Sequence, residues 1–224
     1  MTYKGLIFDF NGVLWWDSYL QEKSWKEYSV KLRGHPLSDE EMSVHVHGRN
    51  NQYTLSYLIG YEVKGDELYN LTQGKESKYR ELCLAEGDNF KLSPGAIELL
   101  DFLKERKINR NIATASEKTN LDFFVERLQL SRWFDIKKIV YDDGSLPGKP
   151  APDLYLRASY NIGLLPKDCI VIEDARSGIE SASRAGIGHI IALGPKERHP
   201  QLNKLTGVSE VVTNLGEVSH TLFI

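Results

Sequence analysis

Five short apolar runs alternate with segments of helical periodicity, and this alternation leaves the chain few folds to adopt. The runs predicted to be strands are Tyr3–Phe10, Asn109–Thr114, Ile136–Tyr141, Cys169–Glu173 and Gly188–Leu193, with a short late strand at 211–214. The helical segments between them are Ala96–Arg106, Lys118–Leu128, Asp153–Tyr160 and Ser177–Ala185. Strands joined by single helices need right-handed crossovers and a parallel sheet covered on both faces. The sequence therefore predicts an α/β fold with a doubly wound, Rossmann-like parallel sheet.

Residues 16–90 interrupt this alternation. They contain four amphipathic helical patterns and no strand pattern. Ser38 is followed three residues later by Glu41, the spacing of a capping box at a helix start. We therefore expect a helical cap domain of about four helices at 16–90, inserted into a Rossmann-like core domain of residues 1–15 and 91–224.

The composition is that of an ordinary soluble globule. The net charge of −3 gives no overall field that would attract nucleic acid or a membrane surface. No apolar run approaches the ~18 residues that a membrane span needs. Cys83 and Cys169 lie in apolar contexts, which predicts buried thiols in a reducing compartment. We expect a cytoplasmic monomer or weak homodimer with neither a nucleic-acid nor a membrane partner.

Polar side chains gather at the predicted strand ends, where ligands bind in doubly wound sheets. They are Asp9, the segment Thr114-Ala115-Ser116, and the pair Glu173-Asp174. Lys149 adds an ammonium in the loop "PGKPAPD" just before a helix. A carboxylate nucleophile, a hydroxyl, an ammonium and an acidic pair together suit phosphoryl transfer with Mg²⁺.

Each of these residues also has an ordinary structural interpretation. A strand-end aspartate commonly caps a turn, and a lysine before proline is commonly solvated. The Glu173-Asp174 pair would also suit the N-cap of the helix that follows. What favours a catalytic site is the joint occurrence of all of these residues, in this order and at these strand ends.

Four segments resemble the four motifs of the haloacid dehalogenase superfamily, in its β-phosphoglucomutase-like branch with a helical cap. They are "FDFNGVL", "IATAS", "GKPAPD" and "VIEDARSGIESASRAG", and the likeness extends over nearly the whole chain. The resemblance implies an Mg²⁺-dependent hydrolase of small phosphate esters that works through an aspartyl-phosphate. Asp9 would be the nucleophile, while Thr114, Ala115, Ser116 and Lys149 would bind the transferred phosphoryl group.

The resemblance also implies a metal-ligand set. Asp9, Asp174 and the backbone carbonyl of Asn11 would bind Mg²⁺, with Glu173 contributing through water. In the cap segment "VHVHGRNN", it implies that Arg49 reaches the part of the substrate that is not transferred, with His47 as the second candidate. The alternative for His45 and His47 is a solvated pair at a helix end, and their spacing with neighbouring residues matches no zinc site.

Asn11 stands where the family's phosphatases and mutases carry a general acid/base aspartate. An amide neither protonates a leaving oxygen nor activates water, and such assistance is worth ~10²–10⁴-fold in rate. The enzyme would then be weakened on sugar phosphates, whose leaving groups are poor. The family's dehalogenases also lack this aspartate, but Lys149 and Glu173-Asp174 favour a metal and a phosphoryl group.

Three alternatives remain open for position 11 and the activity. A sugar phosphomutase is disfavoured by Asn11 and by Gln21, which occupies a slot where the branch often has histidine. A catalytically weak phospho-ligand binding protein would keep the site and lose the acid. An asparagine here also fits an engineered substitution that traps a complex.

Overall fold

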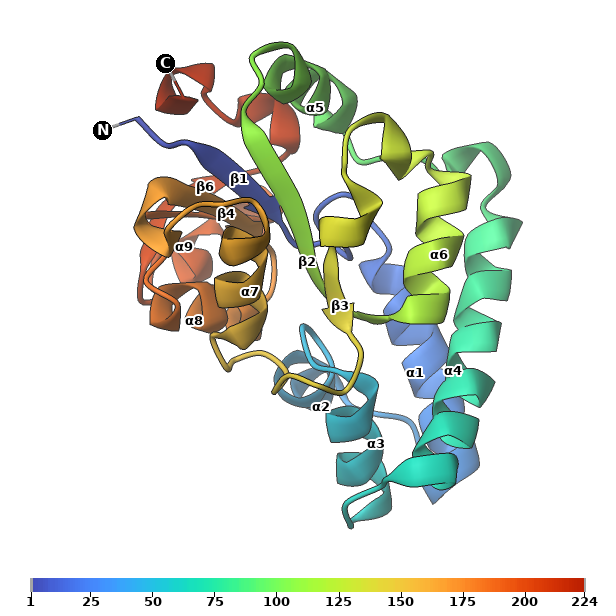
Figure 1. Cartoon of the computed structure of the whole chain (residues 1–224). Coiled ribbons are helices and arrows are strands. Elements are labelled where there is room, and N and C mark those ends of the chain that lie inside the picture. The colour runs from blue at the N-terminus through green and yellow to red at the C-terminus, as the bar shows by residue number, and fades with distance from the viewer. Residues whose placement is uncertain (1, 224) are drawn as a thin grey trace. The chain divides into compact units, whose positions relative to one another are not determined.

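Six parallel strands form one sheet in the computed structural model, which describes residues 2–223 (Figure 1). The strands are β1 Gly5–Phe8, β2 Asn109–Glu117, β3 Val140–Asp142, β4 Cys169–Glu173, β5 His189–Leu193 and β6 Val208–Val212. Their order in the sheet is β3-β2-β1-β4-β5-β6. β1 and β4 are buried along their whole length, as central strands covered on both faces should be. The predicted doubly wound parallel sheet is confirmed.

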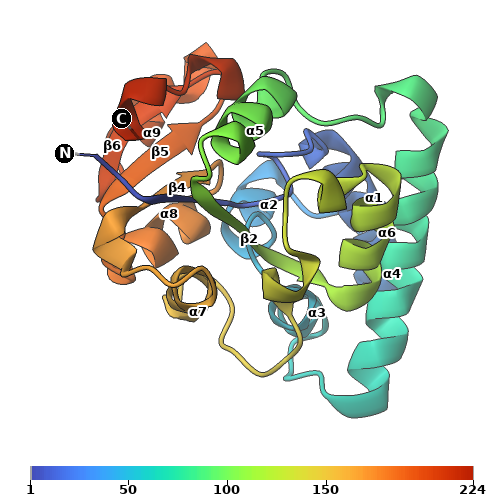
Figure 2. The ribbon, with the colours of Figure 1, turned by 45° about the horizontal axis from the view of Figure 1, so that its top comes forward.

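Helices cover both faces of this sheet. They are α5 Ala96–Glu105, α6 Lys118–Arg127, α7 Asp153–Asn161, α8 Arg176–Arg184 and the short α9 His199–Leu202. Apolar residues of α7 and α8 pack with alternate residues of the central strands, such as Ile7 and Val171, into one buried cluster. Figure 2 shows α5 and α7 on opposite sides of β2. Because strand side chains alternate between faces, the two helix layers meet different residues of each strand.

Contacts divide the chain into two units. The sheet unit comprises Met1–Trp16 with Leu92–Ile224, and the helical unit comprises Asp17–Lys91. The helical unit consists of α1 Ser18–Arg33, α2 Asp39–His45, α3 Asn51–Ile59 and α4 Gly65–Ala85. It has its own apolar core, which includes Trp25, Met42 and Leu55. α2 begins with the capping box that Ser38 and Glu41 predict.

Short 3₁₀ turns lie between these elements or follow the last strand. They are Gly87–Asn89, Leu130–Arg132, Ile136–Lys138, Pro166–Asp168, Lys196–Arg198, Leu215–Glu217 and His220–Phe223. The prediction of one strand over Ile136–Tyr141 is therefore wrong in its first half. The Asp135 side chain accepts a hydrogen bond from the Lys137 backbone N–H, which favours a turn over extended pairing.

Other strand boundaries also differ from the predicted ones. β1 covers only Gly5–Phe8 of the predicted Tyr3–Phe10. β2 continues past Thr114 to Glu117, because an irregularity after Ala113 lets Glu117 pair with Asp142 of β3. The last strand lies at Val208–Val212 instead of 211–214, where it pairs with β5.

Two further findings concern the helices and the cysteines. None of the helices in residues 2–223 combines the length and the apolar character needed to cross a membrane. Cys83 and Cys169 are buried free thiols, as expected.

Candidate active site

The register of the three central strands brings the predicted site residues to one edge of the sheet. Phe8 of β1 is level with Ile112 of β2 and with Ile172 of β4. The next residue on each strand is therefore Asp9, Ala113 or Glu173, at the carboxyl edge. The Asp9 backbone N–H donates to the Ile172 carbonyl at 3.0 Å, which keeps this alignment at the strand tip.

Lys149 is the centre of the charge cluster at this edge. Its ammonium is buried and donates to Asp9 Oδ1 at 2.6 Å, to Glu173 Oε1 at 2.6 Å and to the Ala113 carbonyl at 3.2 Å. An ammonium has three N–H donors, so these three acceptors use all of them. A solvated Lys149 is excluded, and the positive charge is held directly against the candidate nucleophile.

Glu173 is completely buried and fully hydrogen bonded. Oε1 accepts from Lys149 and from the Tyr155 hydroxyl, the latter at 2.7 Å. Oε2 accepts from the backbone N–H groups of Asp174 and Ala175 at 3.0 and 3.1 Å. These four bonds occupy the sites of a carboxylate, so Glu173 anchors Lys149 and the loop after β4. Ala175, not an acidic residue, is the N-cap of α8.

Burial and charge shift the protonation equilibria of the cluster. Burial raises the pKa of the Asp9 carboxyl to about 7; the Lys149 ammonium opposes this rise and the Glu173 charge adds to it. The two carboxylates hold the pKa of Lys149 above its ordinary value, although burial alone would lower it. Lys149 is therefore a permanent cation beside Asp9.

Asp174 completes an acidic group that suits a hard cation. One carboxylate oxygen from each of Asp9, Glu173 and Asp174 lies within 4.8 Å of the others. Gly12 has φ +81°, and a Cβ there would lie 2.3 Å from Asp174 Oδ2. Only glycine leaves room for the Asp174 carboxylate. Oxygen ligands of this kind are those that Mg²⁺ prefers.

Asn11 lies beside the hydroxyl-bearing end of β2. Its Oδ1 accepts a hydrogen bond from Ser116 Oγ at 2.7 Å. The Ser116 backbone N–H donates to Thr114 Oγ1 at 3.1 Å, and Thr114 is itself buried. The structure thus brings Asn11, Thr114, Ala115 and Ser116 to the same edge as Asp9 and Lys149. An amide held in this way orients the loop but carries no dissociable proton at neutral pH.

The predicted substrate residues Arg49 and His47 belong to the helical unit. The Arg49 guanidinium lies 4.6 Å from the centre of the Tyr53 ring, and its Nε donates to the Val44 carbonyl at 3.3 Å. His47 Nε2 lies 3.4 Å from Glu22 Oε1. Both side chains are therefore partly held by neighbours within their own unit.

Sequence reasoning missed a buried ammonium in the helical unit. Lys75 Nζ donates to Gln21 Oε1 at 2.7 Å and to Glu76 Oε1 at 3.0 Å. It also lies 4.7 Å from the centre of the Trp25 ring and 5.0 Å from that of Tyr79. Gln21 therefore has a defined partner. The spacing of Lys75 and Tyr79 by four residues on a predicted helix was the only available signal.

In the sheet unit, sequence reasoning missed Tyr155 and did not infer the structural role of Gly178. Tyr155 falls in the apolar pattern of a helix, so nothing in the sequence singles out its hydroxyl. Gly178 lies within the fourth motif, and a Cβ there would meet Glu173 Oε1 at 1.7 Å. Its role is to admit the Glu173 side chain against α8.

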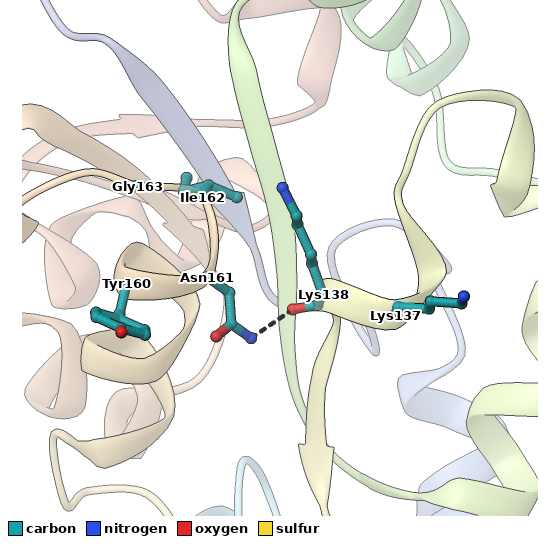
Figure 3. A pocket seen from close by; sticks show the side chains of 6 residues that line it. All are labelled: Lys137, Lys138, Tyr160, Asn161, Ile162 and Gly163. Atoms are coloured by element: carbon teal, nitrogen blue, oxygen red, sulfur yellow. Dashed lines mark hydrogen bonds between the residues drawn. The ribbon is translucent and has the colours of Figure 1, made fainter.

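A separate depression of about 600 Å³ lies at the opposite edge of the sheet (Figure 3). It is lined by Lys137, Lys138, Tyr160, Asn161, Ile162 and Gly163. Asn161 Nδ2 donates to the Lys138 carbonyl at 2.8 Å, which joins the end of α7 to the 3₁₀ turn that precedes β3. Figure 3 shows the Lys137 side chain pointing away from Tyr160. No residue of the carboxyl-edge cluster lines this depression, so the two are distinct.

Comparison with known proteins agrees with this geometry. The haloacid dehalogenase-like hydrolase family model matches residues 3–186. Hexitol phosphatase A of Escherichia coli is 28% identical, and the match covers 92% of this chain and 89% of that protein. β-Phosphoglucomutase of Bacillus subtilis is 29% identical, and the match covers 89% of this chain and 86% of that protein. A solved HAD hydrolase of family IA, variant 3, from Entamoeba histolytica is 34% identical, covers 98% and 97% of the two chains, and has a TM-score of 0.87. The protein thus belongs to the haloacid dehalogenase-like hydrolase family, in its β-phosphoglucomutase-like branch.

Proposed function

We propose that the protein is an Mg²⁺-dependent phosphatase of small phosphate esters that acts through an aspartyl-phosphate on Asp9. The observation that carries the proposal is the buried Lys149 ammonium, 2.6 Å from a strand-tip carboxylate that also belongs to an acidic group. Relatives named as phosphatases of hexitols and phosphorylated carbohydrates support the substrate class. The substrate is a free small molecule, and we propose a cytoplasmic monomer or weak homodimer.

The proposed reaction has two displacements at phosphorus. An Asp9 carboxylate oxygen attacks, the bond to the ester oxygen breaks, and the leaving oxygen takes the electron pair. Water then attacks the aspartyl-phosphate, the bond to Asp9 breaks, and phosphate and the free carboxylate are released. The proton that this water gives up to solvent balances the one that the leaving oxygen takes from solvent. Lys149 offsets the negative charge that gathers around Asp9, and Thr114 and Ser116 hold the phosphoryl oxygens.

The residues present fit a divalent metal. Asp9, Asp174 and the Asn11 carbonyl would hold Mg²⁺, because the four acceptor sites of Glu173 are taken by Lys149, Tyr155 and two backbone N–H groups. Bound Mg²⁺ would neutralise charge on the phosphoryl oxygens. Glu173 would then not be a metal ligand itself. It would position Asp174 by accepting a hydrogen bond from the Asp174 backbone N–H.

A direct test of the metal assignment compares wild type with Asp174→Ala. We expect calorimetry to show weaker Mg²⁺ binding, by about tenfold or more, because a charged oxygen ligand is lost. The rate of Mg²⁺-stimulated aryl phosphate hydrolysis should fall as Mg²⁺ affinity falls. Asp122→Asn is the matched control, since Asp122 is an exposed carboxylate of the same unit, paired with Lys118. Unchanged Mg²⁺ affinity in Asp174→Ala would contradict the assignment of Asp174 as a metal ligand. Wild-type aryl phosphate hydrolysis at the same rate with and without Mg²⁺ would contradict the proposed metal dependence.

Arg49 is the proposed specificity residue of the helical unit. Arg49→Ala should raise KM for the sugar phosphate that the enzyme prefers by about tenfold, because a charged hydrogen bond to the group that is not transferred is lost. Hydrolysis of a small aryl phosphate should change little. Lys64→Ala, which removes an exposed cation of the same unit, is the control. Equal losses on both substrates would mean that Arg49 has a structural or catalytic role instead.

A further inference from the structure

We infer that the Tyr155 hydroxyl is a positioning group, which sets how the Lys149 ammonium is shared between Asp9 and Glu173. This role rests on the proposed function, because it concerns the charge that Lys149 presents to the nucleophile. Tyr155 would act through Glu173 and Lys149 and would not itself touch the substrate.

Tyr155 contacts both ions of the buried pair. It lies on α7, six residues after Lys149, and its side chain is completely buried. Its hydroxyl donates to Glu173 Oε1 at 2.7 Å, the same oxygen that accepts from Lys149 at 2.6 Å. Its ring centre lies 4.9 Å from Lys149 Nζ. One side chain therefore stabilises the carboxylate with its hydroxyl and faces the ammonium with its ring.

The shared oxygen makes the hydroxyl and the ammonium competitors. A carboxylate oxygen that already accepts a hydrogen bond attracts a second donor less strongly, because part of its charge is neutralised. With the hydroxyl present, Lys149 is free to direct its charge toward Asp9 Oδ1 at 2.6 Å. Without it, Glu173 would hold Lys149 more tightly, and Asp9 would lose part of its neutralising partner.

Water is poorly placed to replace the hydroxyl. Glu173 and Tyr155 have no exposed surface, and Lys149 is 2% exposed. The neighbouring space is filled, since a Cβ on Gly178 would already overlap Glu173 Oε1. A buried carboxylate oxygen that loses one of two donors therefore keeps only Lys149 on that atom.

Tyr155→Phe isolates the hydroxyl. Phenylalanine keeps the ring volume and the ring face toward Lys149, so a purely packing role for Tyr155 predicts no catalytic change. Tyr160→Phe is the matched control, because it removes a hydroxyl from the exposed end of the same helix. Melting temperatures of both variants report whether the fold is retained.

The experiment measures phosphorylation of Asp9 by an activated aryl phosphate with saturating Mg²⁺, in single turnover. We expect Tyr155→Phe to slow this step about 10- to 100-fold, the usual cost of losing a residue that orients a catalytic ligand. KM should change by less than about threefold, since binding in the ground state is largely preserved. Repeating the substitution in a Glu173→Gln background should give a much smaller effect, because the charge through which Tyr155 acts has been removed.

The outcomes separate this inference from the proposed function. Wild-type rates in Tyr155→Phe, a loss confined to KM, or an equal loss in the Glu173→Gln background would each overturn the positioning role and leave the phosphatase intact. A wild-type protein that is never phosphorylated on Asp9 would overturn the proposed function, and the role of Tyr155 with it.

Discussion

Asn11→Asp should accelerate the hydrolysis of alkyl and sugar phosphates by about 10²-fold or more, because it supplies a general acid beside Asp9, the proposed nucleophile. Aryl phosphate hydrolysis should rise less, since an aryl leaving group needs no proton and only water attack on the aspartyl-phosphate gains a base. The fold should be kept. Ser116 Oγ, which donates to Asn11 Oδ1 at 2.7 Å, can donate equally to a carboxylate. Steady-state kinetics on paired alkyl and aryl esters measures both gains.

The asparagine must be shown to be intact before this comparison, because Asn-Gly sequences are prone to deamidation. The Gly12 backbone N–H donates to the Trp15 carbonyl at 2.7 Å, which restrains the nitrogen that would attack the Asn11 side chain. Mass spectrometry of the peptide that contains Asn11 supplies the check. If intact Asn11 protein hydrolyses sugar phosphates as fast as Asn11→Asp does, another group donates the proton. His47 or a carboxylate of the helical unit would then be the candidate.

Lys149→Met should abolish measurable phosphorylation of Asp9 and lower the free energy of unfolding by about 3–5 kcal/mol. Methionine has a similar length but no charge, so the buried carboxylates of Asp9 and Glu173 would face each other without their shared cation. The Ala113 carbonyl would also lose its bond to this side chain. Urea denaturation measures the stability, and aryl phosphate labelling measures the reaction.

Lys138→Met is the matched control for this substitution. Lys138 is a half-exposed lysine of the same unit, 4.0 Å from Asp135, and a surface pair of this kind contributes ~1 kcal/mol or less. If Lys149→Met unfolded no more easily than Lys138→Met, the cluster around Asp9 would not be the tightly coupled network that the structure shows.

The sequence predicted the strands best where burial decides the pattern. Cys169–Glu173 was predicted residue for residue, because a central parallel strand is a continuous apolar run. At Ile136–Tyr141 the apolar pattern predicted a strand, but Ile136–Lys138 forms a 3₁₀ turn. The pattern does not show that the Asp135 side chain accepts a hydrogen bond from the Lys137 backbone N–H. Side-chain hydrogen bonds of this kind compete with strand pairing without changing the hydrophobic pattern.

The candidate site was also predictable only where the strand pattern places its residues. Asp9, Thr114 and Asp174 follow from their places at strand tips, since parallel strands bring their carboxyl ends to one edge. The partners of Glu173 could not be predicted, because they depend on which atoms fill its four acceptor positions. Tyr155 was missed for that reason, and Lys75 because its partners Gln21 and Trp25 come from another helix.

Phosphorylation of Asp9 is the measurement that tests the central claim most directly. The protein is mixed with an activated aryl phosphate and Mg²⁺, quenched in acid, digested and analysed by mass spectrometry. We predict one phosphoryl group on Asp9 in the wild type and none in Asp9→Asn, which keeps the side-chain shape. A phosphoryl group on Thr114 or Ser116, or aryl phosphate turnover that survives in Asp9→Asn, would contradict the account.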